Sequence, residues 1–163
     1  MEEARRAGLE AYVGSIDVLP PERRFDAVVM LDLLEHIIDP ARFLDTVHAR
    51  LRPGGRVFIM TPNIRSLLAI VSGRRWVSFK IPEHVYYYSP RSLRRLLGNS
   101  AFEVVSCRGT GQYVTVAFLL DRLGRLVPGL TASLGALART FQLQGRVIFV
   151  TNGSLDVVAR AAL

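Results

Sequence analysis

The chain has 163 residues, of which half are hydrophobic and 21% are charged, a composition that indicates one folded domain and excludes a disordered chain. Its single cysteine, Cys107, excludes a disulfide framework and a cysteine-rich zinc site. The net charge of +7 rests on arginines scattered from Arg5 to Arg160, which favours a composition effect over a nucleic-acid partner.

The first half of the sequence alternates short apolar runs with helical periodicity. Residues 9–13 and 25–31 are strand candidates, and a helix begins after them with Asp39 as N-cap and Pro40 as its first residue. This helix ends at a Pro-Gly-Gly breaker, and residues 56–60 form the next apolar strand. The order predicts a β-α-β crossover, and therefore an α/β fold with a mostly parallel sheet.

The second half is less regular. Ser89 and Pro90 repeat the helix-start signal, and residues 102–107 are a strand candidate. Residues 113–143 have a helical pattern with a break at Pro128 and Gly129. Two apolar runs around Asn152-Gly153, residues 146–150 and 155–159, predict a terminal hairpin. No repeat or low-complexity linker divides the chain, so we expect one domain over residues 1–163.

Polar residues follow the strand candidates at residues 14–17, 31–36 and 61–63, the places where α/β sheets bind ligands. Asp32, Glu35 and His36 are spaced i, i+3 and i+4, which puts them on one face of a helical turn. Such a group can bind a cofactor, hold a divalent metal or transfer protons. It can equally be the acidic start of a helix, matched to the helix dipole.

Residues 25–63 carry a family resemblance. A strand that ends in Asp32, a Leu-Glu-His sequence, an Asp-Pro helix start and a Leu-Arg-Pro-Gly-Gly turn follow one another in order. This segment resembles the centre of class I S-adenosylmethionine-dependent methyltransferases of the small-molecule type. Residues 76–102 resemble the substrate-side insertion of that group, and residues 154–160 resemble its last strand.

The resemblance implies a Rossmann-like sheet, mostly parallel with an antiparallel C-terminal strand or hairpin. It also implies a substrate-side insertion at about residues 64–100 and a variable helical segment at about 111–145. The family's glycine-rich cofactor loop has no counterpart, so the chain is expected to begin about a third of the way into the fold. Gly109-Thr110-Gly111 comes too late to replace that loop and is interpreted as an ordinary loop.

The resemblance further implies S-adenosylmethionine as cofactor. Ser15 and Ile16 would lie beside its adenine, Asp32 and Leu33 would line its methionine side, and His36 could approach the substrate. Asp32, Glu35 and His36 also match a metal-binding pattern of quinone-pathway O-methyltransferases, which suggests a divalent metal.

Two further features leave alternatives open. His84 lies between Glu83 and three tyrosines, and it is either a general base for a substrate hydroxyl or a histidine satisfied by Glu83. The tyrosines favour packing over substrate stacking. Residues 118–127 pair a leucine face with arginines, which suits a helix that covers the site, packs a dimer or contacts a lipid-like substrate.

Two functional hypotheses result. The first is methyl transfer to oxygen, nitrogen or carbon of a small molecule, with His84 or His36 as base. The second is a catalytically incomplete fragment that acts as an interaction module and forms homo-oligomers through an exposed sheet edge. The apolar runs are shorter than the roughly 20 residues of a membrane span, and no leader is visible, so we expect a cytoplasmic protein.

Overall fold

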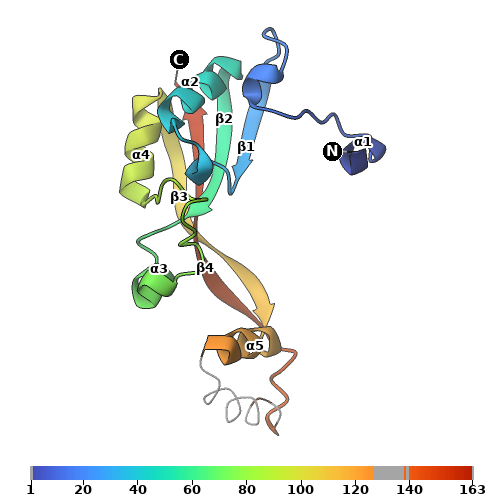
Figure 1. The fold of residues 1–163 in the computed structure, drawn as a ribbon, viewed down its shortest axis with the longest axis vertical. Helices are drawn as coiled ribbons and strands as arrows, with labels where there is room; N and C mark the ends of the chain where they lie inside the picture. Colours follow the sequence, from blue (N-terminus) through green and yellow to red (C-terminus); the bar gives the residue numbers. More distant parts are fainter. Residues whose placement is uncertain (1, 127–137, 139, 163) are drawn as a thin grey trace.

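The computed structural model describes residues 2–126, 138 and 140–162 (Figure 1). Its centre is the predicted β-α-β unit, formed by β1 (Phe25–Leu31), α2 (Pro40–Arg50) and β2 (Leu51–Pro62). Asp39 caps α2 as predicted, because its carboxylate accepts a hydrogen bond from the Arg42 amide at 3.1 Å. The two strands are parallel, and their carboxyl ends therefore meet at one edge of the sheet.

The four-stranded sheet has the order β1-β2-β4-β3. Strands β3 (Phe102–Thr115) and β4 (Val147–Ala161) are antiparallel to each other, and β4 is antiparallel to β2. The antiparallel C-terminal strand and the Rossmann-like fold class are confirmed, whereas the expectation of a mostly parallel sheet is wrong for the described strands, because only β1 and β2 pair in parallel. Beyond the body of the sheet, β3 and β4 continue as a two-stranded arm that carries α5 (Val116–Leu126) at its end (Figure 1).

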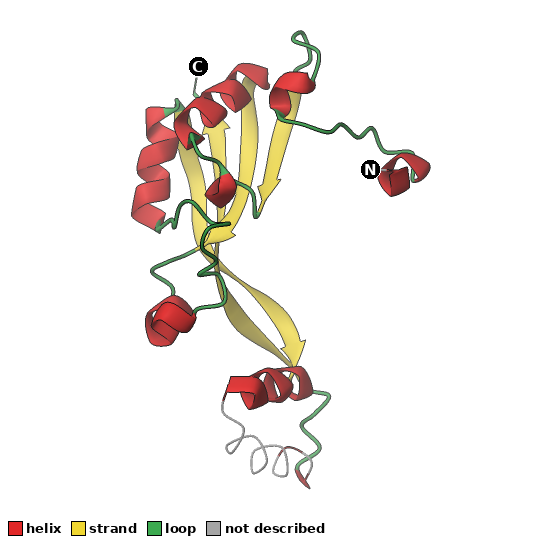
Figure 2. Cartoon of the chain, viewed as in Figure 1, coloured by secondary structure: helices red, strands yellow, loops and turns green. Residues whose placement is uncertain are grey.

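One face of the sheet carries the core. Figure 2 shows α2 and α4 (Pro90–Asn99) along the same side of the strands, where Leu44, Leu93 and Leu97 are fully buried. Ser89 begins α4 through a reciprocal capping box with Ser92, as its Ser-Pro signal predicts. The remaining helices are short: α1 (Glu2–Arg6), η1 (Ile16–Val18), η2 (Leu34–His36), α3 (Leu67–Ser72) and η3 (Gly73–Arg75).

The opposite face is uncovered at β1. Met30 is buried, whereas its neighbours Val29 and Leu31 are 61% and 56% exposed. Because side chains of a strand alternate between faces, these two belong to the side away from α2 and α4. Within the described residues, β1 pairs with β2 alone, so its other edge is free.

The strand predicted at residues 9–13 is wrong. These residues form no strand, and Glu10 instead makes an ion pair with Arg23. A strand requires a neighbouring strand for its backbone hydrogen bonds. In the described structure, residues 9–13 do not pair with the free edge of β1.

The terminal hairpin is also wrong, because β4 runs through Asn152-Gly153 without reversing and pairs with β3 on both sides. Gly109 and Gly111 lie inside β3 and not in a loop, at a register shift opposite that point. Of the predicted helical segment 113–143, residues 113–115 belong to β3 and residues 116–126 form α5. Its break at Pro128 and Gly129 lies outside the described residues.

Candidate active site

A buried carboxyl group lies at the carboxyl ends of the two parallel strands. Glu35 stands in η2, just after β1, and is only 1% exposed. Its Oε2 accepts a hydrogen bond from the hydroxyl of Thr61, at the end of β2, at 2.9 Å. Its Oε1 is buried without a hydrogen-bond partner. An unpartnered buried oxygen is costly in a core, so Oε1 is a candidate contact for a ligand, a cation or a water molecule.

Two histidines complete this cluster. The rings of His36 and His84 meet edge to face with their centroids 4.7 Å apart. His84 is 8% exposed, and its buried Nδ1 has no hydrogen-bond partner among the residues that the structure describes. Each of Glu35, His36 and His84 offers a ligand atom, and these atoms lie within 4.8 Å of one another. The structure thus joins residues that are 48 or 49 positions apart in the sequence.

The backbone holds the His84 loop against η2. The amides of Val85 and Tyr86 both donate to the carbonyl of Glu35, at 2.9 and 3.1 Å. The Nδ1 of His36 lies 2.8 Å from the carbonyl of Glu83. Because a carbonyl can only accept, Nδ1 carries the proton, and in the neutral ring Nε2 keeps its lone pair.

The three tyrosines mainly pack and brace this loop, as predicted. Tyr88 is buried, and its hydroxyl lies 3.4 Å from the carbonyl of Leu34, while Tyr86 donates to the carbonyl of Ile38. Burial raises the pKa of Tyr88, with smaller contributions from Tyr86 and Glu35. Its phenol is therefore a neutral donor at physiological pH.

The four predicted cofactor residues fall into two places. Asp32 and Leu33 follow the carboxyl end of β1, and Asp32 turns the chain with a positive φ of 46°. Ser15 instead caps η1, and Ile16 packs against the core. The carbonyl of Leu19, a few residues further on, accepts a hydrogen bond from Arg50 at the end of α2. This contact places the segment at the amino end of β1 (Figure 1). The cofactor role of all four residues stays a prediction.

Two other sequence interpretations are refined by the geometry. Asp32 is not a member of the described ligand group, whereas Glu35 and His36 are. Glu83 does not satisfy Nδ1 of His84, because that atom has no partner. Sequence reasoning missed the pairing of Thr61 with Glu35, although the position of Thr61 at a strand end was a usable signal. His48, to which no function is assigned, contacts the carbonyl of Ala162 and the ring of Phe102.

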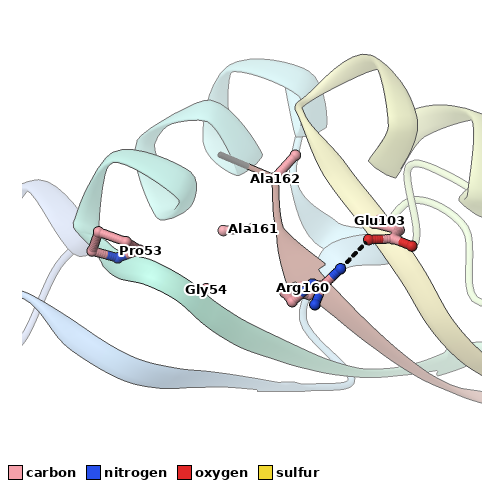
Figure 3. A pocket seen from close by; sticks show the side chains of 6 residues that line it. All are labelled: Pro53, Gly54, Glu103, Arg160, Ala161 and Ala162. Atoms are coloured by element: carbon pink, nitrogen blue, oxygen red, sulfur yellow. Dashed lines mark hydrogen bonds and ion pairs between the residues drawn. The ribbon is translucent and has the colours of Figure 1, made fainter.

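A hollow of about 350 Å³ is lined by none of the cluster residues, and Figure 3 shows its lining from close by. Its lining includes Pro53 and Gly54 near the start of β2, and Glu103 and Arg160, which form an ion pair at 2.6 Å. Thr61 stands at the other end of β2. Because α/β sheets bind ligands at the carboxyl ends of their parallel strands, we assign this hollow no part in the site.

Comparisons with known proteins agree with the fold. A family model described as a methyltransferase domain matches residues 3–107. The ubiquinone biosynthesis O-methyltransferase of Idiomarina loihiensis is 33% identical over 91 residues, which are 52% of this chain and 37% of the relative. The chain therefore spans well under half the length of that relative.

Solved structures extend the likeness to nearly the whole chain. An S-adenosylmethionine-dependent methyltransferase from Thermotoga maritima matches with a TM-score of 0.58 at 17% identity, over 98% of this chain and 67% of that one. The [4+2]-cyclase SpnF matches with a TM-score of 0.55 at 16% identity, over 99% of this chain and 60% of that one. Such identities show the fold alone, and SpnF illustrates that one fold carries different reactions. S-adenosylmethionine is the cofactor that the family and the fold imply.

Proposed function

We propose that this chain, which belongs to the methyltransferase domain family, transfers a methyl group from S-adenosylmethionine to an oxygen atom of a small-molecule acceptor. The name of the relative, an O-methyltransferase, favours oxygen over nitrogen or carbon. The cluster of Glu35, His36 and His84 carries the proposal, because it puts a carboxyl group and two imidazoles where α/β sheets bind ligands.

When bound, S-adenosylmethionine supplies an electrophilic methyl group on a sulfonium sulfur. The acceptor oxygen forms a bond to that carbon as the carbon–sulfur bond breaks, and the bonding electrons return to sulfur, which leaves S-adenosylhomocysteine. Alignment of the two reactants supplies most of the rate in such a transfer. The acceptor hydroxyl also loses its proton, and a positioned base typically contributes about 10²- to 10⁴-fold.

We assign that base to His84, with His36 as the neighbouring alternative. Nδ1 of His84 has no hydrogen-bond partner among the described residues, so its lone pair is not committed to a neighbouring group of the protein. Glu35 lies beside the ring, and a negative charge there stabilises the imidazolium that forms. Thr61 fixes the orientation of Glu35 and is therefore a positioning residue.

The same three residues fit a divalent metal, and the fit differs from the sequence expectation. Glu35 Oε1 and His84 Nδ1 are buried without partners, and His36 has a second ring nitrogen to offer. We propose that Glu35, His36 and His84 would hold the ion in place of the set Asp32, Glu35 and His36. A bound cation would occupy the lone pair of His84, so it would replace His84 as the group that promotes loss of the acceptor proton, and it would stabilise the deprotonated acceptor oxygen.

Calorimetric titration with S-adenosylhomocysteine, followed by methyl-transfer assays, tests the proposal. We expect the folded chain to bind this product, and we expect His84→Asn to lose about 10²- to 10⁴-fold in rate while it still binds. His48→Asn, outside the cluster, serves as the control and should keep its rate. A folded chain that binds no S-adenosylhomocysteine would overturn the enzyme proposal for this chain alone.

The second candidate function is an interaction module. The free edge of β1 and the exposed Val29 and Leu31 favour it, because an unpaired strand edge invites pairing with another chain. Absence of product binding combined with association in solution would select this function over catalysis.

A further inference from the structure

A second surface, separate from the catalytic cluster, is unusually apolar and basic. The segment of residues 64–81, which contains α3 and η3, buries Ala69 and Trp76 but exposes most of its other large apolar side chains. Leu67 and Val71 of α3 are 72% and 76% exposed. The complete exposed set is Ile64, Leu67, Leu68, Ile70, Val71, Val77, Phe79 and Ile81. So many outward-facing apolar side chains in one short segment mark an interaction surface.

The charge of this 64–81 segment has one sign. It carries four exposed basic residues, which are Arg65, Arg74, Arg75 and Lys80. The sequence contains no aspartate or glutamate from residue 46 to residue 82. The apolar side chains are therefore interspersed with uncompensated positive charge, a combination that suits a surface both apolar and anionic.

The segment is fixed on its inner side. Trp76 is buried and packs near Tyr87, and the ring of Phe79 stacks on Tyr87 with centroids 5.0 Å apart. The amide of His84 donates to the carbonyl of Lys80 at 2.8 Å. These contacts anchor residues 76–80 and join the segment directly to the loop that carries His84.

We infer that the 64–81 segment docks on the surface of an anionic lipid bilayer. Its apolar side chains would enter the boundary between headgroups and acyl chains, while the arginines and the lysine meet anionic headgroups. Among the described residues, no helix is both long and apolar enough to cross a bilayer. A second copy suits the surface less well, because a symmetric contact sets the same four cations against each other.

Docking of the 64–81 segment has a consequence for the choice of acceptor, and this consequence rests on the proposed function. A bilayer bound at residue 81 lies next to the loop that positions His84. An acceptor that partitions into lipid would then reach the cluster without crossing water. The docking itself depends only on the fold and the surface.

Vesicle co-sedimentation of the full chain tests the docking without any activity assay. We expect binding to vesicles of phosphatidylcholine mixed with phosphatidylglycerol, weaker binding to phosphatidylcholine alone, and weakening by added salt. The double variant R74Q/R75Q should bind about 30-fold more weakly, from about fivefold for each basic residue at an anionic surface. L67D/V71D should bind weakly as well, and both variants change exposed side chains and should fold normally.

The matched control is R94Q/R95Q, which removes two exposed arginines from α4. It should keep wild-type binding to within about twofold. An equal loss in this control would show that net charge alone attracts the chain, and that result overturns the docking site. Absence of binding to anionic vesicles, or a stable dimer in solution that L67D/V71D dissociates, overturns it too.

Discussion

Within the described part of the chain, the Glu35 side chain has one hydrogen-bond donor, the hydroxyl of Thr61. The hydroxyl of Thr61 satisfies Oε2, while Oε1 has no partner. We predict that Thr61→Val lowers the free energy of unfolding by about 1–3 kcal/mol, because it leaves the buried carboxyl group with no donor. Thr61→Ser keeps the hydroxyl and should lose less. Urea unfolding monitored by circular dichroism measures both changes, and equal losses for Ser and Val would assign the effect to packing instead.

Tyr88 gives the site a pH-dependent element. Burial raises its pKa in the folded protein above the ordinary value of 10.0, so the folded chain holds this proton more tightly than the unfolded chain does. The corresponding stability is complete below about pH 10 and is lost as the pH rises through the raised folded value. We predict that Tyr88→Phe has a shallower fall in stability than wild type between about pH 9 and pH 11. Urea unfolding across that range provides the measurement, and identical slopes would contradict the prediction.

At the scale of elements, the helix-cap signals were reliable. Asp39 with Pro40 and Ser89 with Pro90 marked the starts of α2 and α4 because a cap uses atoms only a few residues apart. We predict that Asp39→Ala costs about 1 kcal/mol of stability, since the Arg42 amide loses its acceptor. Asp45→Ala, on the exposed side of the same helix, should change stability by less than about 0.5 kcal/mol. Thermal unfolding of the two variants tests this difference, which equal shifts would contradict.

Long-range pairing set the limit of sequence prediction. Asn152-Gly153 is a strong hairpin signal, but its flanking runs both pair with β3. Residues 9–13 have a strand composition and find no partner strand. In the site, the i, i+3, i+4 spacing pointed to Asp32, Glu35 and His36, of which the structure places Glu35 and His36 in one group of potential ligands. It could not show that His84 joins them, because tertiary hydrogen bonds bring that loop to η2.

The two glycines of Gly109-Thr110-Gly111 differ in their surroundings, which distinguishes their roles. A Cβ at Gly111 would come within 2.6 Å of the carbonyl of Val150 and 2.5 Å of the Phe149 ring, whereas a Cβ at Gly109 would meet nothing within 4 Å. We predict that Gly111→Ala destabilises the chain by about 1–3 kcal/mol, the usual cost of overpacking. Gly109→Ala is the matched control and should be close to neutral. Urea midpoints compare the variants, and hydrogen exchange should show faster opening of β3 and β4 in Gly111→Ala alone.

For the whole molecule, the sheet has one covered face and one open side at β1. Sequence reasoning anticipated the family, the fold class and an exposed sheet edge. Val29 and Leu31 are exposed on β1, whose outer edge is unpaired in the described structure. Apolar side chains and unpaired backbone groups therefore coincide on this strand. Burial of this area is a route to association that does not involve the 64–81 segment.

We therefore predict that the purified chain associates through β1. Sedimentation velocity over a range of concentrations should show a shift from monomer to a larger species. Val29→Lys should weaken the association at least tenfold, because a lysine at the centre of the contact must be buried or expelled. Val13→Lys, which alters an exposed valine outside the sheet, is the control for added charge and should associate as wild type does. A monomer at all concentrations, or equal effects of the two lysines, would assign the open face of β1 to some other role than self-association.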